Sequence, residues 1–371
     1  MTPIRILIVD DSSTTRLLMT RLLTRDPNVE IVATAADGQI ALAKLDRTLP
    51  DLVLLDVEMP LLNGLETLCA LRQKYPVLPV IMFSRLTKRG TAESVEALFL
   101  GADDYVPKPD SSAALEHCIE HELLPRIRSL VDSRAGVWAA TSVKPATIPA
   151  DSQRRPVAES PISLRADVPV TPIDVVTIAA STGGPAALAT VLSALPSDLK
   201  TPTLIVQHMP VGFTAAFADR LSQRTGLEVK EAQPDQPLTA AQVWVAAADH
   251  HLLLRRDSGS KSSDVYLHLN QEAAEHSCRP AANVLFRSAA DVFGPAVLGV
   301  VLTGMGVDGL AGSQAIVNAG GRVIVQDEAS SVVWGMAGSV ARAGLADAML
   351  TPVRVGRMIR QRLSESLREG N

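Results

Sequence analysis

Asp51-Leu-Val-Leu-Leu-Asp56 is a short apolar stretch that ends on an acidic residue, and it decides the fold of the first part of the chain. Such a run, bounded by polar residues, is typical of a strand buried on both faces of a parallel sheet. The carboxyl ends of parallel strands open into the crevice where α/β proteins bind their ligands. We therefore expect the Asp56 carboxylate to lie in a binding crevice at the edge of a sheet.

Polar residues follow other apolar runs in the same part of the chain. Asp10 and Asp11 come after the first run, Ser84 ends a later one, and Lys108 follows the last. Three carboxylates and one lysine at one sheet edge can hold Mg²⁺ and a phosphoryl group, because Mg²⁺ prefers oxygen ligands and bridges carboxylates to phosphate. Asp56 would be the nucleophile that accepts the phosphoryl group as an acyl phosphate.

The remaining polar residues at this edge are expected to respond to phosphorylation. Lys108 would pair with a phosphoryl oxygen and Ser84 would hydrogen-bond it, while Tyr105, one strand over, would change rotamer. Each residue taken alone is more often a solvated loop side chain or a helix cap. The ordered set of Asp-Asp, Asp, Ser and Lys-Pro at successive strand ends is not explained that way. It predicts a phosphorylation switch.

The composition is that of a globular protein with two domains. The chain has 371 residues, of which 47% are hydrophobic, and this length allows two separate cores. A net charge of −5 without a basic stripe gives nucleic-acid binding no electrostatic support. Three widely spaced cysteines form neither a disulfide framework nor a metal cluster, which favours a reducing compartment. With no signal-peptide pattern and no apolar run of about 18 residues, we expect a cytoplasmic protein without membrane insertion.

Alternating strand and helix patterns give the organisation of the chain. Residues 1–130 contain five strand–helix repeats, which predict a parallel sheet covered on both faces. Residues 131–171 form a Pro/Ser-rich linker. Residues 172–366 return to the alternating pattern, with a hairpin over 252–270 whose turn we place at Asp257-Ser-Gly259. The predicted fold class is α/β, a parallel domain followed by a doubly wound, mostly parallel α/β domain with an antiparallel hairpin.

The sharpest feature of the second domain is Ile178-Ala-Ala-Ser-Thr-Gly-Gly-Pro185. An apolar strand ends at Ser181, a tight turn follows, and a helix begins near Pro185. A serine hydroxyl is thereby exposed beside the positive end of a helix, as in a nucleophile elbow, although Ala179 stands where the G-x-S-x-G pattern has its first glycine. The segment would serve equally well as a phosphate-binding glycine loop. A plain strand-to-helix turn is a third, weaker interpretation.

A histidine and an aspartate at equivalent positions favour the nucleophile. His208 follows the next apolar strand, and Asp308 lies in the loop after the most apolar strand of the domain. Because parallel strands end at one edge, Ser181, His208 and Asp308 are expected to share a hydrogen-bonded line. His208 would take the proton of Ser181, and Asp308 would hold the imidazole in the required tautomer. The chain order Ser–His–Asp differs from that of the α/β-hydrolases, so this is a different fold.

The other histidines are weaker candidates. His250 and His251 are adjacent and would point to opposite faces of a strand, which favours polar packing over a metal pair. His117 and His121 are four residues apart with no third ligand in view, so we expect surface residues. We interpret His276-Ser-Cys278 as part of a substrate-groove loop rather than as a metal or thiol site.

Residues 1–130 resemble a response-regulator receiver domain. The residues that carry the resemblance are Asp10-Asp11, Asp56 within Asp-Val-Glu-Met-Pro60, Ser84, Gly101-Ala-Asp-Asp-Tyr105 and Lys108-Pro109. The resemblance implies a flavodoxin-like fold and Mg²⁺-dependent phosphorylation of Asp56 by a chemotaxis histidine kinase. It also implies that the backbone carbonyl of Glu58 is a further metal ligand.

Residues 172–366 resemble the catalytic domain of the chemotaxis protein-glutamate methylesterases, the CheB family. The motifs are Ala180-Ser-Thr-Gly-Gly184, Gln207-His-Met-Pro210, Leu302-Thr-Gly-Met-Gly306 with Asp308-Gly309, and Arg279-Pro280 with Asn283-Val-Leu-Phe286. The resemblance implies Ser181 as nucleophile, His208 as general base and Asp308 as orienting acid. The implied reaction is hydrolysis of γ-glutamyl methyl esters on methyl-accepting chemoreceptors, without a cofactor, for chemotactic adaptation. The same machinery deamidates certain receptor glutamines.

Two backbone N–H groups are candidates to stabilise the oxyanion of that reaction, that of Met305 first and that of Thr182 second. The sequence also departs from the family pattern at three positions. Ala179 replaces a glycine, Asn283 an acidic residue, and Ala337 a proline. None belongs to the predicted triad, so we expect these changes to affect the substrate groove rather than the reaction.

Two other classes of protein are less well supported. A DNA-binding regulator would need a helix-turn-helix and a basic excess after the linker, and the sequence has neither. A phosphate- or nucleotide-binding module would use the loop after Ser181 but leave His208 and Asp308 without a role.

The CheB resemblance further implies that an unphosphorylated receiver covers the catalytic face and that phosphorylation loosens it.

Overall fold

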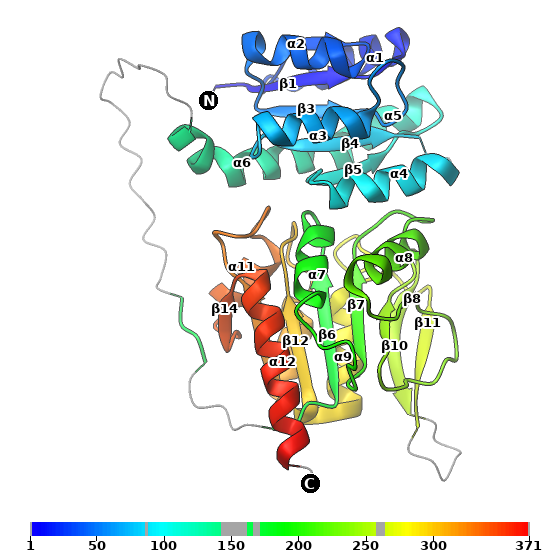
Figure 1. The fold of residues 1–371 in the computed structure, drawn as a ribbon, viewed down its shortest axis with the longest axis vertical. Helices are drawn as coiled ribbons and strands as arrows, with labels where there is room; N and C mark the ends of the chain where they lie inside the picture. The colour runs from blue at the N-terminus through cyan, green and yellow to red at the C-terminus, as the bar shows by residue number, and fades with distance from the viewer. Residues whose placement is uncertain (1, 86–87, 142–161, 166–170, 257–263, 370–371) are drawn as a thin grey trace.

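The structure is a computed structural model that describes residues 2–85, 88–141, 162–165, 171–256 and 264–369. Two α/β units follow one another along the long axis of the molecule (Figure 1), the first in blue to cyan and the second in green to red. Among the described residues, no helix has the length and apolar character needed to span a membrane.

The first unit is built on a five-stranded parallel sheet of order β2-β1-β3-β4-β5. Its strands are β1 (Ile4–Val9), β2 (Val29–Ala35), β3 (Leu52–Leu55), β4 (Val80–Ser84) and β5 (Asp104–Pro107). Its helices are α1 (Ser13–Leu23), α2 (Gly38–Thr48), α3 (Gly64–Lys74), α4 (Lys88–Phe99), α5 (Ser112–Cys118), the π-helical turn η1 (Ile119–Leu123) and α6 (Leu124–Thr141). This strand order is the flavodoxin-like one, which confirms the predicted class.

Side-chain caps begin the helices that follow the strands. Ser12 caps α1, Asp37 caps α2 and Asn63 caps α3, each accepting a backbone N–H three residues on. At α3, Glu66 completes a capping box. These caps fix the loops that leave the strand ends, and the polar residues at the carboxyl edge are held in place as a result.

The second unit is built on a seven-stranded parallel sheet of order β14-β13-β12-β6-β7-β9-β8. Its strands are β6 (Val175–Ala180), β7 (Thr203–Gln207), β8 (Val229–Glu231), β9 (Val243–Val245), β12 (Val297–Val301), β13 (Arg322–Gln326) and β14 (Ala348–Leu350). Its helices are α7 (Gly184–Leu192), α8 (Thr214–Thr225), α9 (Ala282–Phe293), the 3-10 turn η2 (Gly294–Ala296), α10 (Leu310–Asn318), α11 (Met336–Arg342) and α12 (Pro352–Glu369). The chain builds outward from β6 in both directions, so a topological switch point lies beside that strand.

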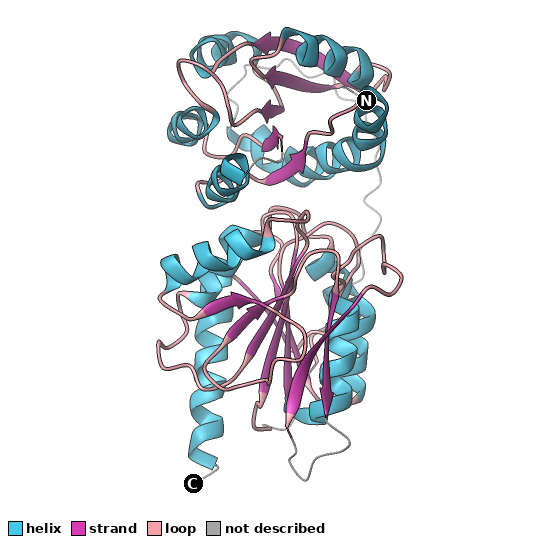
Figure 2. Cartoon of the chain, turned by 90° about the vertical axis from the view of Figure 1, so that its right-hand side faces the viewer, coloured by secondary structure: helices cyan, strands magenta, loops and turns pink. Residues whose placement is uncertain are grey.

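Alternate residues of β6 pack against helices on opposite faces of this sheet. Val176 and Ile178 belong to the cluster formed with α7, α8 and α12, whereas Val175 and Ala179 belong to the cluster formed with α9, α10 and α11. Figure 2 shows the sheet between these two layers of helices. Every residue of β6 is buried, and Ser181, which follows its carboxyl end, lines a cavity.

The structure agrees with the predicted hairpin and differs from the predictions at three other elements. Strands β10 (His251–Arg256) and β11 (Val265–Asn270) pair antiparallel, and the predicted turn at 257–259 lies outside the described residues. Helix α6 continues to Thr141, so the predicted linker begins as a helix, and residues 142–161 and 166–170 of it lie outside the described residues. Strands β8 and β14 were not predicted, because three residues carry too little pattern to be read.

The carboxyl edge of the second sheet faces α4, β5 and α6 of the first unit (Figures 1 and 2). Phe99 of α4 stacks on Phe217 of α8, with ring centroids 5.7 Å apart. Glu96 of α4 pairs with Arg220 of α8. Val333 of the second unit joins a hydrophobic cluster of the first. The two units therefore share a packed interface beside the edge where the candidate catalytic residues lie.

Candidate active site and phosphorylation site

Ser181 directly follows β6 and is only 8% exposed. Its N–H donates to Thr303 O (3.0 Å), and its carbonyl accepts from Gln207 Nε2 (2.9 Å). Helix α7 begins three residues later, with Pro185 in its first turn. Among the residues that the structure describes, no group hydrogen-bonds to the Ser181 hydroxyl. The backbone of Ser181 is fixed, while its hydroxyl remains available for chemistry.

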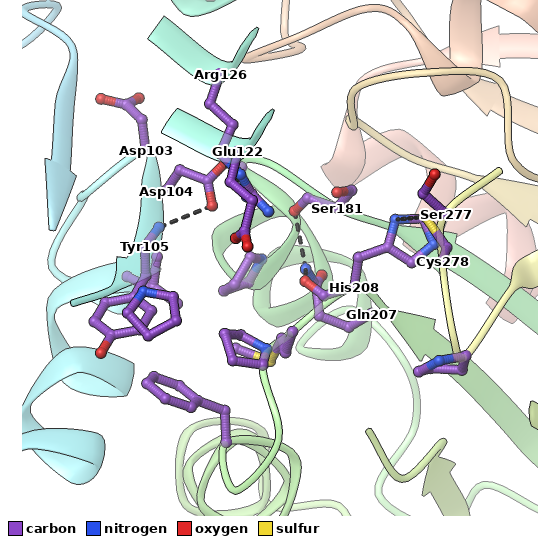
Figure 3. Close-up of a pocket in the computed structure, with 18 of the residues that line it drawn as sticks. Asp103, Asp104, Tyr105, Glu122, Arg126, Ser181, Gln207, His208, Ser277 and Cys278 are labelled. Carbon is purple, nitrogen blue, oxygen red and sulfur yellow. Dashed lines mark hydrogen bonds and ion pairs between the residues drawn. The ribbon is translucent and has the colours of Figure 1, made fainter. Parts of the chain in front are cut away.

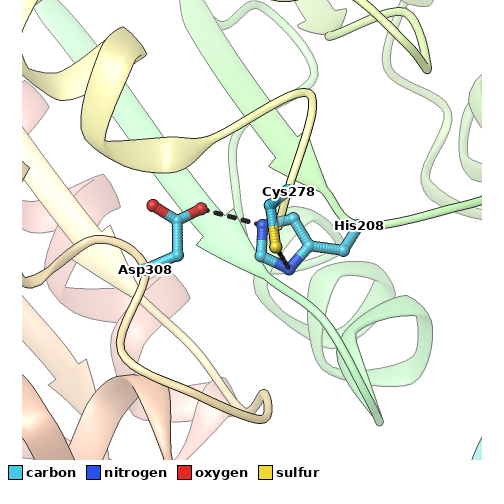
Figure 4. A group of neighbouring side chains, drawn as sticks. All are labelled: His208, Cys278 and Asp308. Carbon is cyan, nitrogen blue, oxygen red and sulfur yellow. Dashed lines mark hydrogen bonds and ion pairs between the residues drawn. The ribbon is translucent and has the colours of Figure 1, made fainter. Parts of the chain in front are cut away.

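His208 follows β7 on one side of β6, and Asp308 lies in the loop after β12 on the other side. His208 Nε2 lies 2.8 Å from Asp308 Oδ2 (Figure 4). Nδ1 is therefore the imidazole nitrogen without a carboxylate partner. Within the described residues no hydrogen bond joins His208 to Ser181, although both line one cavity. The structure thus brings His208 and Asp308 together and leaves the serine in the same cavity without a bond to them.

The amino end of α9 holds the Asp308 carboxylate. Ala282 N–H donates to Oδ2 (2.6 Å) and Asn283 N–H donates to Oδ1 (3.0 Å). The Asn283 side chain in turn accepts from the N–H groups of Gly309 (3.0 Å) and Gly312 (2.8 Å). Because a helix N-terminus favours negative charge, this arrangement keeps Asp308 ionised and fixed. Asn283, which the sequence associated with the substrate groove, instead braces the loop of Asp308.

Burial and hydrogen bonding act in opposite directions on the two pKa values of this pair. Burial raises the pKa of Asp308, but the bonds to His208 and to the N–H groups of α9 bring it below its ordinary value. Burial lowers the pKa of His208, but Asp308 and the neighbouring Cys278 raise it to about 9. In this arrangement of the two units, the pair is ionic at neutral pH.

Gly304 packs directly against Ser181. A Cβ added at Gly304 would lie 2.8 Å from the Ser181 Cβ, so the close approach requires a glycine. The next N–H along the chain, that of Met305, has no hydrogen-bond acceptor among the described residues, and the same holds for Thr182. Both N–H groups predicted as oxyanion donors are therefore free and lie near the serine in sequence or space.

A cavity of about 320 Å³ lies where the two units meet (Figure 3). It is lined by Ser181, His208 and Cys278 from the second unit and by Asp104, Tyr105, Glu122 and Arg126 from the first. Thr182 Oγ1 donates to Asp104 Oδ2 (2.6 Å), an oxygen that also accepts from Arg126 Nη1 (2.8 Å). Gly183 N–H donates to Asp103 O (3.0 Å). The first unit therefore holds both residues that follow Ser181.

Asp56 lies at the end of β3 and is 7% exposed. Lys108 Nζ pairs with Asp56 and with Asp10, whose Oδ2 is 2.5 Å away. Asp10, Asp11 and Asp56 each present an oxygen within 4.8 Å of the others, and this spacing of hard ligands suits Mg²⁺. Burial raises the pKa of Asp56, and Lys108 offsets part of that effect. Glu58 is exposed in the loop that follows.

Ser84 and Tyr105 lie buried between the phosphorylation site and the second unit. Tyr105 Oη donates to Ser84 O (2.8 Å), and the Tyr105 ring lies 4.5 Å from that of Phe213, between centroids. Burial raises the pKa of Tyr105, so its hydroxyl stays protonated. Tyr105 thus contacts the strand beside Asp56 through its hydroxyl and the second unit through its ring.

The remaining candidates fall into two groups. His251 is 1% exposed and uses both ring nitrogens in hydrogen bonds to backbone groups, and His117 and His121 lie together on the surface. Cys278, in contrast, places its Sγ 3.7 Å from His208 Nδ1 (Figure 4). The loop around Cys278 lines the cavity beside Ser181 and also brings its thiol into direct contact with the histidine.

Comparison with known proteins gives the chain a family. A model of the CheB methylesterase matches residues 176–359, and a model of the response regulator receiver domain matches residues 6–120. A protein-glutamate methylesterase/protein-glutamine glutaminase of Trichodesmium erythraeum is 43% identical over 349 residues, which is 93% of this chain and 95% of that protein. The chain belongs to the CheB methylesterase family. A relative with the same name from a Nocardioides species is 43% identical over 97% of this chain and 96% of its own.

Within the CheB methylesterase family, the first unit is the receiver domain and the second is the methylesterase domain. The crystal structure of the Thermotoga maritima CheB methylesterase catalytic domain is 35% identical and covers 53% of this chain and 99% of that chain, with a TM-score of 0.48. The receiver domain implies control by phosphorylation. The described part of this CheB-family chain places both domains in contact at the edge that carries Ser181.

Several residues that shape the site of this CheB-family chain were not expected from the sequence. Gln207 had no expected role and Asn283 was expected to affect the substrate groove, although polar residues buried beside strand ends are a usable signal. Asp104 and Cys278 carry no such signal. Asp104 acts across the domain interface and Cys278 meets a histidine 70 residues away in the chain.

Proposed function

We propose that the protein hydrolyses γ-glutamyl methyl esters on methyl-accepting chemoreceptors and deamidates receptor glutamines, under the control of phosphorylation at Asp56. Family membership supports the reaction class. The observation that carries the assignment is that His208, in an ionic pair with Asp308, lines one cavity with a serine whose hydroxyl has no hydrogen-bond partner among the described residues.

The proposed chemistry starts at the Ser181 hydroxyl. Once His208 is unprotonated, its Nδ1 accepts the hydroxyl proton while Oγ bonds to the ester carbonyl carbon, and the bond to Asp308 keeps Nε2 as the protonated nitrogen. Collapse of the tetrahedral intermediate breaks the bond to methoxide, which takes the proton from His208 and leaves as methanol. Water then attacks the acyl-enzyme with the same help and releases the glutamate. General acid–base help of this kind contributes roughly 10²–10⁴-fold.

Backbone donors stabilise the charge that develops on the carbonyl oxygen. The Met305 N–H is the first candidate, because Gly304 brings its turn against Ser181. The Thr182 N–H is the second. A donor of this kind is typically worth about 10²–10³-fold in rate. An amide substrate follows the same path with ammonia as the leaving group, which accounts for glutamine deamidation.

Asp56 is the proposed site of phosphoryl transfer from a chemotaxis histidine kinase. Asp10, Asp11 and Asp56, with the Glu58 carbonyl, would hold Mg²⁺, which when bound neutralises charge on the transferring phosphoryl group. Lys108 already pairs with Asp56 and would pair with a phosphoryl oxygen instead.

Regulation follows from the position of the receiver domain. Asp104 binds Thr182, the residue next to the nucleophile, and Tyr105 packs on Phe213 beside the same cavity. A phosphoryl group on Asp56 would draw Ser84 toward it and release the bond from Tyr105 to the Ser84 carbonyl. The receiver contacts that cover the methylesterase site would then weaken.

Replacing Ser181 by alanine tests the proposal. We expect Ser181→Ala to abolish methanol release from methylated receptor while phosphorylation of Asp56 by acetyl phosphate and Mg²⁺ is unchanged, because the two sites are chemically separate. Methanol release and phosphoprotein are measured on the same full-length sample. Substantial esterase activity in the variant would rule out Ser181 as the nucleophile.

A further inference from the structure

The described residues contain a second possible metal site, at the methylesterase centre itself. His208, Cys278 and Asp308 each offer a ligand atom, and these atoms all lie within 4.8 Å of one another. Figure 4 shows the carboxylate joined to one nitrogen of the imidazole and the thiol joined to the other. A thiolate and an imidazole together select soft or borderline metals such as Zn²⁺ over Mg²⁺.

The distance between sulfur and nitrogen fits such a metal. With a Zn–S bond of about 2.3 Å, a Zn–N bond of about 2.0–2.1 Å and a tetrahedral angle, the two ligand atoms lie roughly 3.5 Å apart. Cys278 Sγ and His208 Nδ1 are 3.7 Å apart. The separation of the two ligand atoms is therefore within a few tenths of an ångström of the value that a shared zinc ion requires, which is roughly the tolerance of such a site.

Asp308 supplies the support that a zinc-bound histidine usually has. Its Oδ2 lies 2.8 Å from Nε2, whereas Cys278 Sγ contacts the other ring nitrogen, Nδ1. A carboxylate that accepts the second N–H of a histidine fixes the ring and leaves the other nitrogen with a lone pair for the metal. The same bond that prepares Nδ1 to accept a proton prepares it to bind zinc.

The backbone around Cys278 holds the thiol in position. Glu275 and Cys278 exchange two backbone hydrogen bonds (3.1 and 2.8 Å), and the two residues between them, His276 and Ser277, have positive φ angles of 50° and 63°. Such a turn is rarely built without glycine or asparagine, and it persists only when the surrounding contacts fix it. Glu275 is fixed in turn by an ion pair with Arg287.

We propose that Zn²⁺ binds to Cys278 Sγ and His208 Nδ1 and reversibly inhibits the hydrolase. The Cys278 thiol and the protonated Nδ1 of His208 each release a proton to solvent, zinc takes the lone pair that this frees on Nδ1, and water completes the coordination. With that lone pair occupied, His208 has no atom left to accept the Ser181 proton. The inhibition rests on the proposed esterase function, whereas binding of the metal does not.

Binding is tested on the full-length protein with Co²⁺ and Zn²⁺ in the presence of excess Mg²⁺, which occupies the receiver carboxylates. We expect Co²⁺ to produce a thiolate-to-cobalt absorption band that Zn²⁺ abolishes. The band should be absent in Cys278→Ser and retained in Cys69→Ser, in which an exposed thiol elsewhere is removed. It should also be retained in His121→Ala, which removes the surface pair formed with His117. A band that survives in Cys278→Ser would overturn the site.

Inhibition is tested by methanol release at buffered concentrations of free zinc. Each variant is compared with itself in a zinc chelator, so any effect of the substitution on the basal rate cancels. The zinc concentration that halves the rate should rise at least about tenfold in Cys278→Ser, because even the outer partners of zinc ligands are worth about 10–100-fold in affinity. Equal sensitivity of wild type and Cys278→Ser, or an insensitive wild type, would refute the inhibition. A cobalt band without any esterase activity would contradict the proposed function and leave the metal site standing.

Discussion

His208 is the proposed general base, so its protonation would decide when the site can work. Its pKa of about 9 means that the imidazolium form dominates at neutral pH, and that form cannot accept the Ser181 proton. For each unit by which the pH falls below this pKa, the fraction of enzyme with unprotonated His208 falls about tenfold. Above the pKa the fraction levels off.

We therefore expect the rate of methanol release by the unphosphorylated protein to rise from neutral pH until about 9 and then to level off. Initial rates are measured in a zinc chelator, on a substrate concentration below saturation, so that they report the free enzyme. Asp308→Asn, which removes the carboxylate that raises this pKa, should move the rise to lower pH. A rate that is flat between neutral and alkaline pH would show that His208 is not the base.

At the scale of elements, the contact between β5 and the loop after β6 involves Thr182, the residue next to the proposed nucleophile. Asp104 Oδ2 accepts from both Thr182 and Arg126, and the bond to Thr182 is buried. The Glu96–Arg220 pair between α4 and α8 joins the same domains but is partly exposed. Buried hydrogen bonds to charged groups contribute about 1.5–3 kcal/mol, whereas exposed ion pairs contribute about 0.2–1 kcal/mol.

Asp104→Ala should accordingly raise the esterase rate of the unphosphorylated protein by roughly tenfold or more, as expected for the loss of a bond worth about 1.5–3 kcal/mol. Arg220→Ala is the matched variant at the partly exposed contact, and it should change the rate only a few-fold. Both rates are measured without phosphodonor and again after acetyl phosphate, where the variants should converge on the wild type. Equal rates for Asp104→Ala and the wild type before phosphorylation would mean that this contact does not restrain the site.

Sequence analysis predicted the elements and strand ends well, for a physical reason. A fully buried parallel strand such as β3 or β6 is an unbroken apolar run, so its carboxyl end can be read directly, and Asp56, Ser181 and His208 each stand at such an end. The association of Asp308 with His208 could be expected from the same geometry.

Contacts that depend on how two surfaces meet could not be predicted in this way. The bond from Thr182 to Asp104 joins two domains across 78 residues, and nothing in either segment marks the other as its partner. The approach of Cys278 to His208 depends on a strained turn at His276 and Ser277, which no glycine announces. Strands as short as β8 and β14 have too few residues to show a period.

At the scale of the whole molecule, the phosphate on Asp56 must act through the interface, since Asp56 does not line the catalytic cavity. Asp56→Asn should therefore remove activation by acetyl phosphate and Mg²⁺ while the basal rate of methanol release stays at the wild-type level. Rates with and without phosphodonor are compared in the two proteins. Activation that persists in Asp56→Asn would place the phosphorylation site elsewhere.

The interface also limits how far phosphorylation can shift the equilibrium between the closed and the open arrangement of the two domains. Opening it exposes the stacked rings of Phe99 and Phe217 and the tilted pair of Tyr105 and Phe213. Aromatic pairs are worth about 0.5–1.5 kcal/mol beyond the area that they bury. A phosphoryl group must offset this free energy before any catalytic face is uncovered, and each 1.4 kcal/mol corresponds to about a tenfold change in the open population.

The proposed nucleophile and the residue held by the receiver are joined by a single peptide bond, since Ser181 precedes Thr182. Because the two residues are adjacent, substitutions that would make the protein permanently active differ in their effect on the chemistry, depending on which domain carries them. A change within the loop after β6 alters restraint and chemistry together, because the free N–H of Thr182 is a proposed oxyanion donor. A change at Asp104 removes the side-chain bond to Thr182 and leaves the residues of the serine loop in place. If variants are selected for esterase activity that does not depend on the kinase, we therefore expect substitutions on the receiver side of the interface rather than in the serine loop.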